Sequence, residues 1–149
     1  MKLRKRKVGS QQRDGVAAVE FAILTPILFL IIAGTMEVCS ALFLQEALTV
    51  CAYEGARTAT QRKATEAQVV ARVEEVLEER GIVNGTVAVE PTPEAAILFQ
   101  PVVVTVTAPT TGNTILPLSR WYSWMGNLNF QGEVSLVKEF SDVNPPASP

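Results

Sequence analysis

Apolar residues dominate one stretch near the amino terminus of this 149-residue chain. From Phe21 to Met36 there is no charged residue, and these 16 residues would span about 24 Å as a helix, which is short for a bilayer core of about 30 Å. Counted from Val16, the segment has 21 residues and spans about 31 Å. The pattern therefore predicts a transmembrane helix over residues 16–36, with a single acid, Glu20, near its start.

The helical pattern continues beyond the apolar stretch. On a helical projection, the polar residues fall within an arc of about 80°: Glu46, Glu54, Arg57 and Gln61. Small or apolar residues repeat on another side of the helix: Val38, Ala41, Leu48, Ala52, Ala56 and Ala59. We expect one helix from Val16 to about Ala59, kinked or loosened at Pro26, with residues 37–63 outside the membrane. Gly55 would allow close approach, either of the chain's own sheet or of a neighbouring subunit.

Residues 64–140 predict a small α+β domain. Thr65-x-x-Gln68 is a capping box, and an apolar stripe followed by Gly81 predicts a second, amphipathic helix; the stripe is Val69, Val70, Val73, Val76 and Leu77. Three runs have strand character: Thr86 to Glu90, Val102 to Ala108 and Glu133 to Phe140. The middle run alternates, as expected of a strand with one face on the long helix. We expect an antiparallel sheet of about three strands.

Two further segments complete the chain. An aromatic cluster lies between the second and third strand runs and is interpreted as a core plug or as an exposed docking surface; it contains Trp121, Tyr122, Trp124 and Met125. The tail, residues 141–149, has three prolines and is expected to be disordered.

Charge is segregated along the chain. Residues 1–15 form a polar, basic leader with six of the 13 cations and one of the 15 acids, so the remainder carries a formal net charge of −7. An acidic folded part argues against nucleic acid as a partner. The cations before the apolar segment predict a cytoplasmic amino terminus and an extracytoplasmic carboxyl terminus. An ordinary signal peptide, cut after Cys39-Ser-Ala41, is the competing interpretation.

Few residues suit catalysis or ligand binding. The chain has no histidine, no glycine-rich phosphate loop and no paired-cysteine metal motif, so we expect no enzyme, no cofactor, no metal and no small-molecule substrate. The four acids Glu74, Glu75, Glu78 and Glu79 are interpreted as a solvated helix face. Cys39 and Cys51 lie about 18 Å apart on one helix and cannot bond to each other, which leaves buried packing or a bond between subunits.

Glu20 is the residue that needs an explanation. An acid inside an apolar segment usually marks a function or a fixed partner, although one so near the end could also lie harmlessly in the headgroup layer. Gly15, followed by Glu20 five positions on and then Phe21, resembles the processing site of class III prepilin peptidase substrates. The resemblance implies cleavage between Gly15 and Val16.

A longer pattern makes the resemblance narrower. The chain is similar to the TadE-like minor pseudopilins of tight-adherence (Flp-type) pili from about Arg13 to Ala59, through Arg13-x-Gly15, Val19-Glu20-Phe21-Ala22, Pro26, Glu37, Ala47 and Glu54-Gly55-Ala56-Arg57. In the family a short aromatic-rich stretch often follows the acid that corresponds to Glu37. This chain departs from that pattern, since Cys39 and Cys51 intervene here. The resemblance implies a pilin-like fold and subunit packing through Glu20, Pro26, Gly55 and Arg57.

The expected function follows from this resemblance. It implies an inner-membrane protein that is cut by prepilin peptidase, binds other pilins or pseudopilins and the pilus assembly platform, and helps to assemble or prime an adhesive pilus. The alternative is a solitary single-pass protein with a small extracytoplasmic interaction domain that joins no filament.

Overall fold

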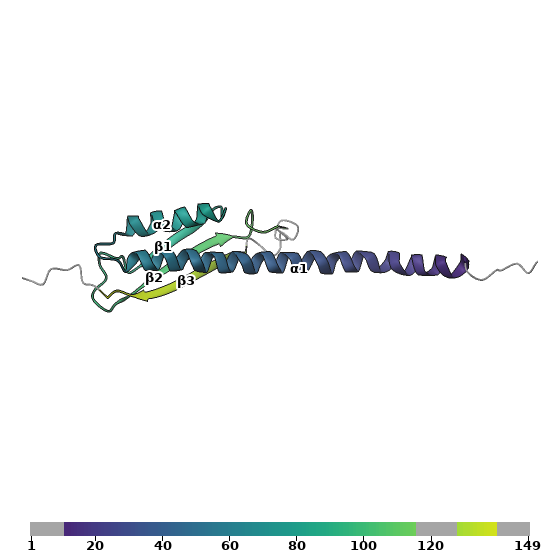
Figure 1. Ribbon diagram of the computed structural model, residues 1–149, viewed down its shortest axis with the longest axis horizontal. Helices are drawn as coiled ribbons and strands as arrows, with labels where there is room; N and C mark the ends of the chain where they lie inside the picture. The colour runs from purple at the N-terminus through teal and green to yellow at the C-terminus, as the bar shows by residue number, and fades with distance from the viewer. Residues whose placement is uncertain (1–10, 116–127, 140–149) are drawn as a thin grey trace, which may run out of the picture. The chain divides into compact units, whose positions relative to one another are not determined.

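The described part of the chain contains two helices followed by three strands (Figure 1). The computed structural model describes residues 11–115 and 128–139, with side chains from Gly15 onward. The elements are α1, Gln11–Ala59; α2, Glu66–Glu79; β1, Thr86–Glu90; β2, Pro101–Pro109; and β3, Asn129–Val137. The predicted α+β class is confirmed, with its long apolar first helix, its second helix and its three-stranded antiparallel sheet. The predicted Trp121–Met125 cluster and the tail, residues 141–149, lie outside the described residues.

The chain divides into two compact units, Met1–Met36 and Glu37–Pro149, and α1 contributes to both. The helix begins at Gln11, five residues before the predicted start at Val16, and stays helical through Pro26. The sequence places residues 11–15 in the polar, basic leader. Glutamine and arginine have high helix propensity, so the helix extends upstream of the apolar segment.

The second helix has the ends that its sequence predicts. The Thr65 hydroxyl accepts from the Gln68 amide, and the Gln68 side chain accepts from the Thr65 amide, so the capping box is complete. At the other end Gly81 has φ of +66°, and the amides of Gly81 and Ile82 donate to the carbonyls of Glu78 and Leu77. This is a Schellman motif, in which glycine takes the left-handed conformation at no steric cost.

The sheet has the order β1-β2-β3 and presents one face to the helices. In β2 the buried residues alternate with half-exposed ones, as predicted; the buried set is Val102, Val104, Val106 and Ala108. β3 occupies Asn129–Val137 and not residues 133–140 as predicted. Gly132, which has low strand propensity, lies inside the strand and is buried, because the contact with α1 requires a residue without a side chain.

The core of the second unit lies between the sheet and the two helices. Helix α1 buries one face there, made of Leu44, Leu48, Cys51, Ala52, Gly55, Ala56 and Ala59. The predicted stripe is confirmed from Leu48 to Ala59, but Val38 is exposed because α1 meets the sheet only after that position. Leu44 and Cys51, which lie outside the predicted stripe, complete the buried face.

Candidate functional site

The predicted processing residues lie together on the exposed surface of α1. Gly15, Val16, Glu20 and Phe21 are all exposed, and a side chain added at Gly15 would meet nothing within 4 Å. Within the first unit the chain offers these residues no cover. No other part of this unit covers the side chains around the Gly15–Val16 bond, which lies within α1, and cleavage there stays a prediction.

The apolar segment that follows is exposed along its whole length. Large side chains from Val16 to Ile32 are about half to two thirds exposed, as in Phe29 at 69%. The most apolar part of α1 has a mean hydropathy of 2.5 and is long enough to cross a membrane, and none of it is buried within the chain. So much exposed apolar surface calls for lipid or for other helices. The segment fits a membrane anchor, whose orientation stays a prediction.

The hydroxyls of the two threonines in this segment are satisfied within the helix. The hydroxyl of Thr25 donates to the carbonyl of Phe21 at 2.7 Å, and that of Thr35 donates to the carbonyl of Ile31 at 2.8 Å. Such bonds to the preceding turn remove the hydroxyl's need for water. Threonine is thus compatible with a lipid environment at both positions.

The Glu54-Gly55-Ala56-Arg57 motif is divided between the core and the surface. Gly55 is buried, and a Cβ placed on it would lie 2.5 Å from Cγ2 of Val73 and 3.1 Å from Cγ1 of Val104. Because glycine has no side chain, α1, α2 and β2 can meet at this point. The structure gives Gly55 a role within the chain's own core, and a contact with a neighbouring subunit stays a prediction.

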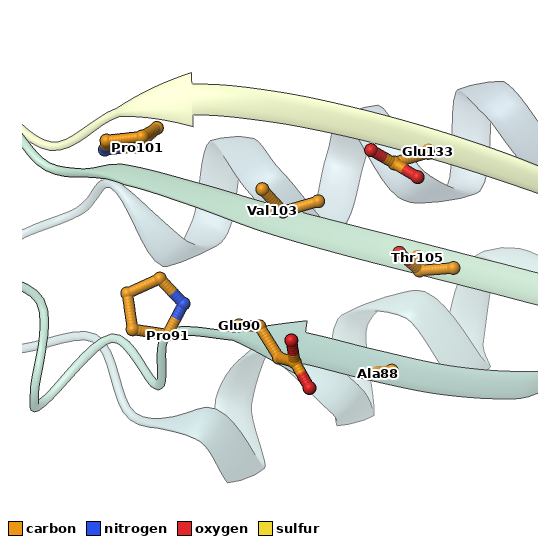
Figure 2. A pocket seen from close by; sticks show the side chains of 7 residues that line it. All are labelled: Ala88, Glu90, Pro91, Pro101, Val103, Thr105 and Glu133. Atoms are coloured by element: carbon orange, nitrogen blue, oxygen red, sulfur yellow. The ribbon is translucent and has the colours of Figure 1, made fainter.

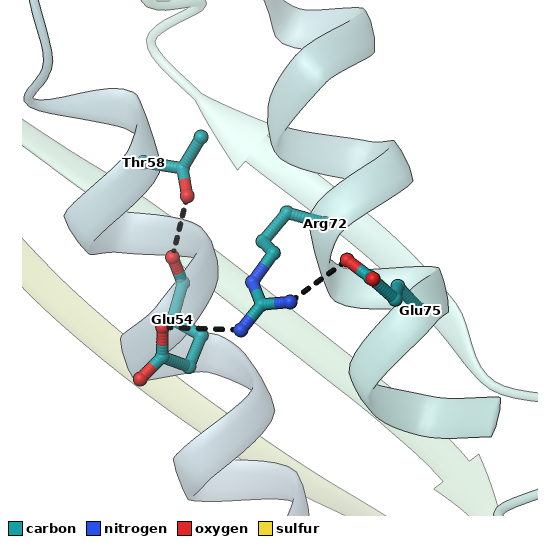
Figure 3. Close-up of polar contacts among 4 residues, drawn as sticks. All are labelled: Glu54, Thr58, Arg72 and Glu75. Atoms are coloured by element: carbon teal, nitrogen blue, oxygen red, sulfur yellow. Dashed lines mark hydrogen bonds and ion pairs between the residues drawn. The ribbon is translucent and has the colours of Figure 1, made fainter. Parts of the chain in front are cut away.

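Glu54, the acid of the motif, lies opposite Arg72 of α2 (Figure 3). Arg72 of α2 reaches Glu54 at 3.7 Å and Glu75 at 2.7 Å. The hydrogen bond that the Arg72 guanidinium donates to the Glu75 carboxylate raises the pKa of Arg72, so the group stays charged. Exposed pairs of this kind contribute little to stability. Among the described residues no acid pairs with the exposed Arg57, and a contact of Arg57 with a neighbouring chain stays a prediction.

The two cysteines have different environments. Cys39 is exposed on α1, whereas Cys51 is fully buried in the core, and both are free thiols. Burial raises the pKa of the Cys51 thiol, an effect that the positive charge of Arg80 partly opposes. Cys51 is therefore a neutral packing residue, and of the two thiols only that of Cys39 can meet a reagent or another chain without unfolding.

Three interactions that hold the second unit together were not predicted from the sequence. Gly132 lies against the α1 backbone, the Thr114 hydroxyl donates to a Glu37 carboxylate oxygen at 2.9 Å, and the fully buried Lys138 donates through Nζ to the Pro93 carbonyl at 2.6 Å. A glycine inside a strand signals close backbone approach. The sequence holds no comparable signal for Thr114 or Lys138.

The outer face of the sheet holds a shallow hollow (Figure 2). Its lining is small and apolar at the centre, with the acids Glu90 and Glu133 on the edge strands. Across residues 15–115 and 128–139, no three His, Cys, Asp or Glu side chains come close enough to hold a metal ion. The hollow therefore offers no recognisable chemistry, and the amino-terminal helix remains the candidate site.

Comparison with known proteins agrees with this assignment. Residues 15–57 match the family model described as TadE-like protein, from the glycine of the predicted processing site to Arg57. No curated protein and no solved structure gives a significant match. The matched residues comprise the exposed apolar segment and the part of α1 that enters the core. The chain therefore carries a TadE-like region, at residues 15–57.

Proposed function

We propose that this chain is a minor pseudopilin of a tight-adherence (Flp-type) pilus, which helps to assemble or prime the pilus for adhesion. The observation that carries the proposal is the coincidence of the TadE-like region with α1. The first half of this helix is apolar and exposed, and its second half packs one face into the core of a folded domain. A TadE-like region suggests a pilus-associated protein. The exposed half supplies the surface that a membrane and then other pilins would cover.

In this proposal residues 16–36 anchor the protein in the inner membrane. The six cations before Gly15 hold the amino terminus in the cytoplasm, and the domain that begins at Glu37 lies outside. Prepilin peptidase then cuts between Gly15 and Val16 at the cytoplasmic face. Phe21 and Glu20 complete the motif that the peptidase would read.

Cleavage would create a new positive charge beside a negative one. The ammonium of Val16 and the carboxylate of Glu20 lie one helical turn apart in the same chain. Each alone would be costly among apolar helices, whereas paired they offset one another. A pair formed between the acid of one subunit and the amine of the next would also set the axial register of the subunits.

Intact-mass analysis of the membrane-extracted protein, with and without the peptidase, tests the proposal. We expect a mature protein that begins at Val16 and has lost residues 1–15 only when the peptidase is active. A Gly15→Leu variant is the matched control and should stay uncut. An amino terminus near Leu42, or an uncut chain beside an active peptidase, would contradict the proposal.

A solitary membrane protein is the second candidate. It is favoured by the closed core of the second unit, which needs no other subunit for its own packing. A solitary anchor has no use for Glu20, so the effect of neutralising this acid on co-isolation with pilins separates the two candidates.

A further inference from the structure

One end of the second unit carries an apolar surface that its own core does not use. This surface, here termed the basal patch, lies where α1 enters the unit and consists of Val38, Leu42, Phe43, Ile115 and Leu128, each between 45% and 70% exposed. Beyond Phe43 the exposed positions of α1 turn mainly polar, at Glu46 and Thr49, with Val50 and Tyr53 as exceptions. Exposed apolar residues also occur elsewhere in the unit, as at Ile97, Phe99 and Val137, so the basal patch is distinguished by its place directly after the apolar segment.

Hydrogen bonds hold the loop residues of the patch beside the helix. The amide of Ile115 donates to the Ser40 hydroxyl at 3.1 Å, and the neighbouring Thr114 binds Glu37. Asn113 fixes the same loop through three bonds, to the amide and carbonyl of Val83 and to the carbonyl of Pro109. The Thr110 amide donates to the Leu128 carbonyl. Ile115 is therefore presented outward by a braced loop.

The charge pattern of this end is also suited to an apolar environment. Glu37 is the only ionisable acid of α1 between Phe21 and Phe43, and its carboxylate accepts from Thr114 instead of pointing freely outward. A hydrogen-bonded carboxylate is less costly to bring near lipid than a bare one. The loop thus covers the one acid at this level with a hydroxyl donor.

We infer that the basal patch lies in the headgroup layer of the bilayer, so that the domain rests on the membrane surface. The inference depends on the proposed anchoring by residues 16–36. Met36 and Glu37 are covalently adjacent, so the patch begins at the end of the apolar segment whatever the angle between the two units. Residues 37–43 rise about 10 Å, comparable to a headgroup layer of roughly 5–8 Å.

Nitroxide labels on the full chain test the inference. The chain is reconstituted in phosphatidylcholine–phosphatidylglycerol vesicles, with the label on the native Cys39, which is exposed and lies between patch residues, or on Phe43→Cys or Ile115→Cys in a Cys39→Ser background. Phe99→Cys in the same background is the control, since Phe99 is 71% exposed and its amide bonds to Lys138, just beyond the far end of β3. We expect the ratio of oxygen to nickel-chelate collisions to be several-fold higher at the patch than at Phe99.

Each outcome decides the inference. A nickel chelate that reaches position 43 as freely as position 99 would overturn it. Spin–spin broadening at position 43 that disappears on dilution with unlabelled chain would also overturn it, because a second copy would then cover the patch. If either substitution prevents folding, the label on Cys39 in the unaltered chain decides. Flotation of the vesicles separates the two proposals: a chain that does not float lacks the anchor, whereas one that floats with a water-exposed patch disproves only this inference.

Discussion

Gly132 of β3 lies directly on the backbone of Leu48 in α1. A Cβ built on Gly132 would be 2.4 Å from the carbonyl carbon of Leu48 and 2.5 Å from the amide nitrogen of Thr49. One residue earlier, the side-chain amide of Gln45 donates to the Gln131 carbonyl at 2.7 Å. Strand and helix backbones therefore touch at this point, and together these contacts set how β3 lies along the helix.

Gly132→Ala should destabilise the folded domain by about 3 kcal/mol or more, because the added methyl meets main-chain atoms that cannot move away as a side chain could. Denaturant unfolding of the full chain in detergent, followed by circular dichroism, would measure the loss. Gly34→Ala is the control, since a Cβ there meets nothing within 4 Å. Equal stability of the Gly132→Ala variant and the parent would show that α1 and β3 are not held at this distance.

Gly55→Ala should cost about 1–3 kcal/mol for the same reason, but here the nearest atom belongs to a side chain, Cγ2 of Val73. Val73→Ala removes that atom, although it also leaves a cavity. In a double-mutant cycle the paired variant should therefore lose less stability than the two single variants together. Strict additivity would mean that the clash at Gly55 is relieved in another way.

The stability of the domain should fall in alkaline solution because of Cys51. Its thiol has a raised pKa in the folded protein, so above the ordinary thiol pKa of about 8.5 the unfolded chain loses this proton before the folded one does. The stability that the protonated Cys51 thiol contributes to the folded domain is fully present below that pH and is lost as the pH rises through the pKa of the folded state. Unfolding free energy measured from pH 7 to 10 should decline less steeply in Cys51→Ala than in the parent.

Cys39→Ser serves as the control for this pH series, since Cys39 is exposed. Its slope should match that of the parent. A Cys51→Ala variant with the parental slope would show that another group governs the alkaline loss.

Glu20→Gln should leave membrane insertion and cleavage intact, because an amide is less costly in the membrane than an acid. It should reduce co-isolation with other pilins and the number of pili, since the ammonium of Val16 would lose its partner. Affinity isolation and electron microscopy measure the two effects, with Glu46→Gln as the control for loss of an exposed acid on the same helix. A variant that is cut, co-purifies and supports pili like the parent would mean that Glu20 is only interfacial, and would favour the solitary anchor.

The elements of this protein could be predicted because their signals are local. The uncharged run before Glu37, the capping box from Thr65 to Gln68, the stop at Gly81 and the alternation in β2 are each read from residues within a few positions of one another. The periodicities of helix and strand link such positions directly to a buried face. The TadE-like region was recognisable for the same reason, since its motif residues lie within one helix.

Tertiary structure alone decided which surfaces meet. Val38 and Leu48 both fit the predicted stripe, yet only Leu48 is buried, because the sheet reaches α1 after the first turns of the domain. The contact of Gly132 with Leu48, the bond from Thr114 to Glu37 and the burial of Lys138 against Pro93 each join residues 45 or more positions apart. Local propensity contains no information about such pairs. Such contacts form only when the chain closes its core. A glycine or a lysine then has a different role from the same residue in an open strand or loop.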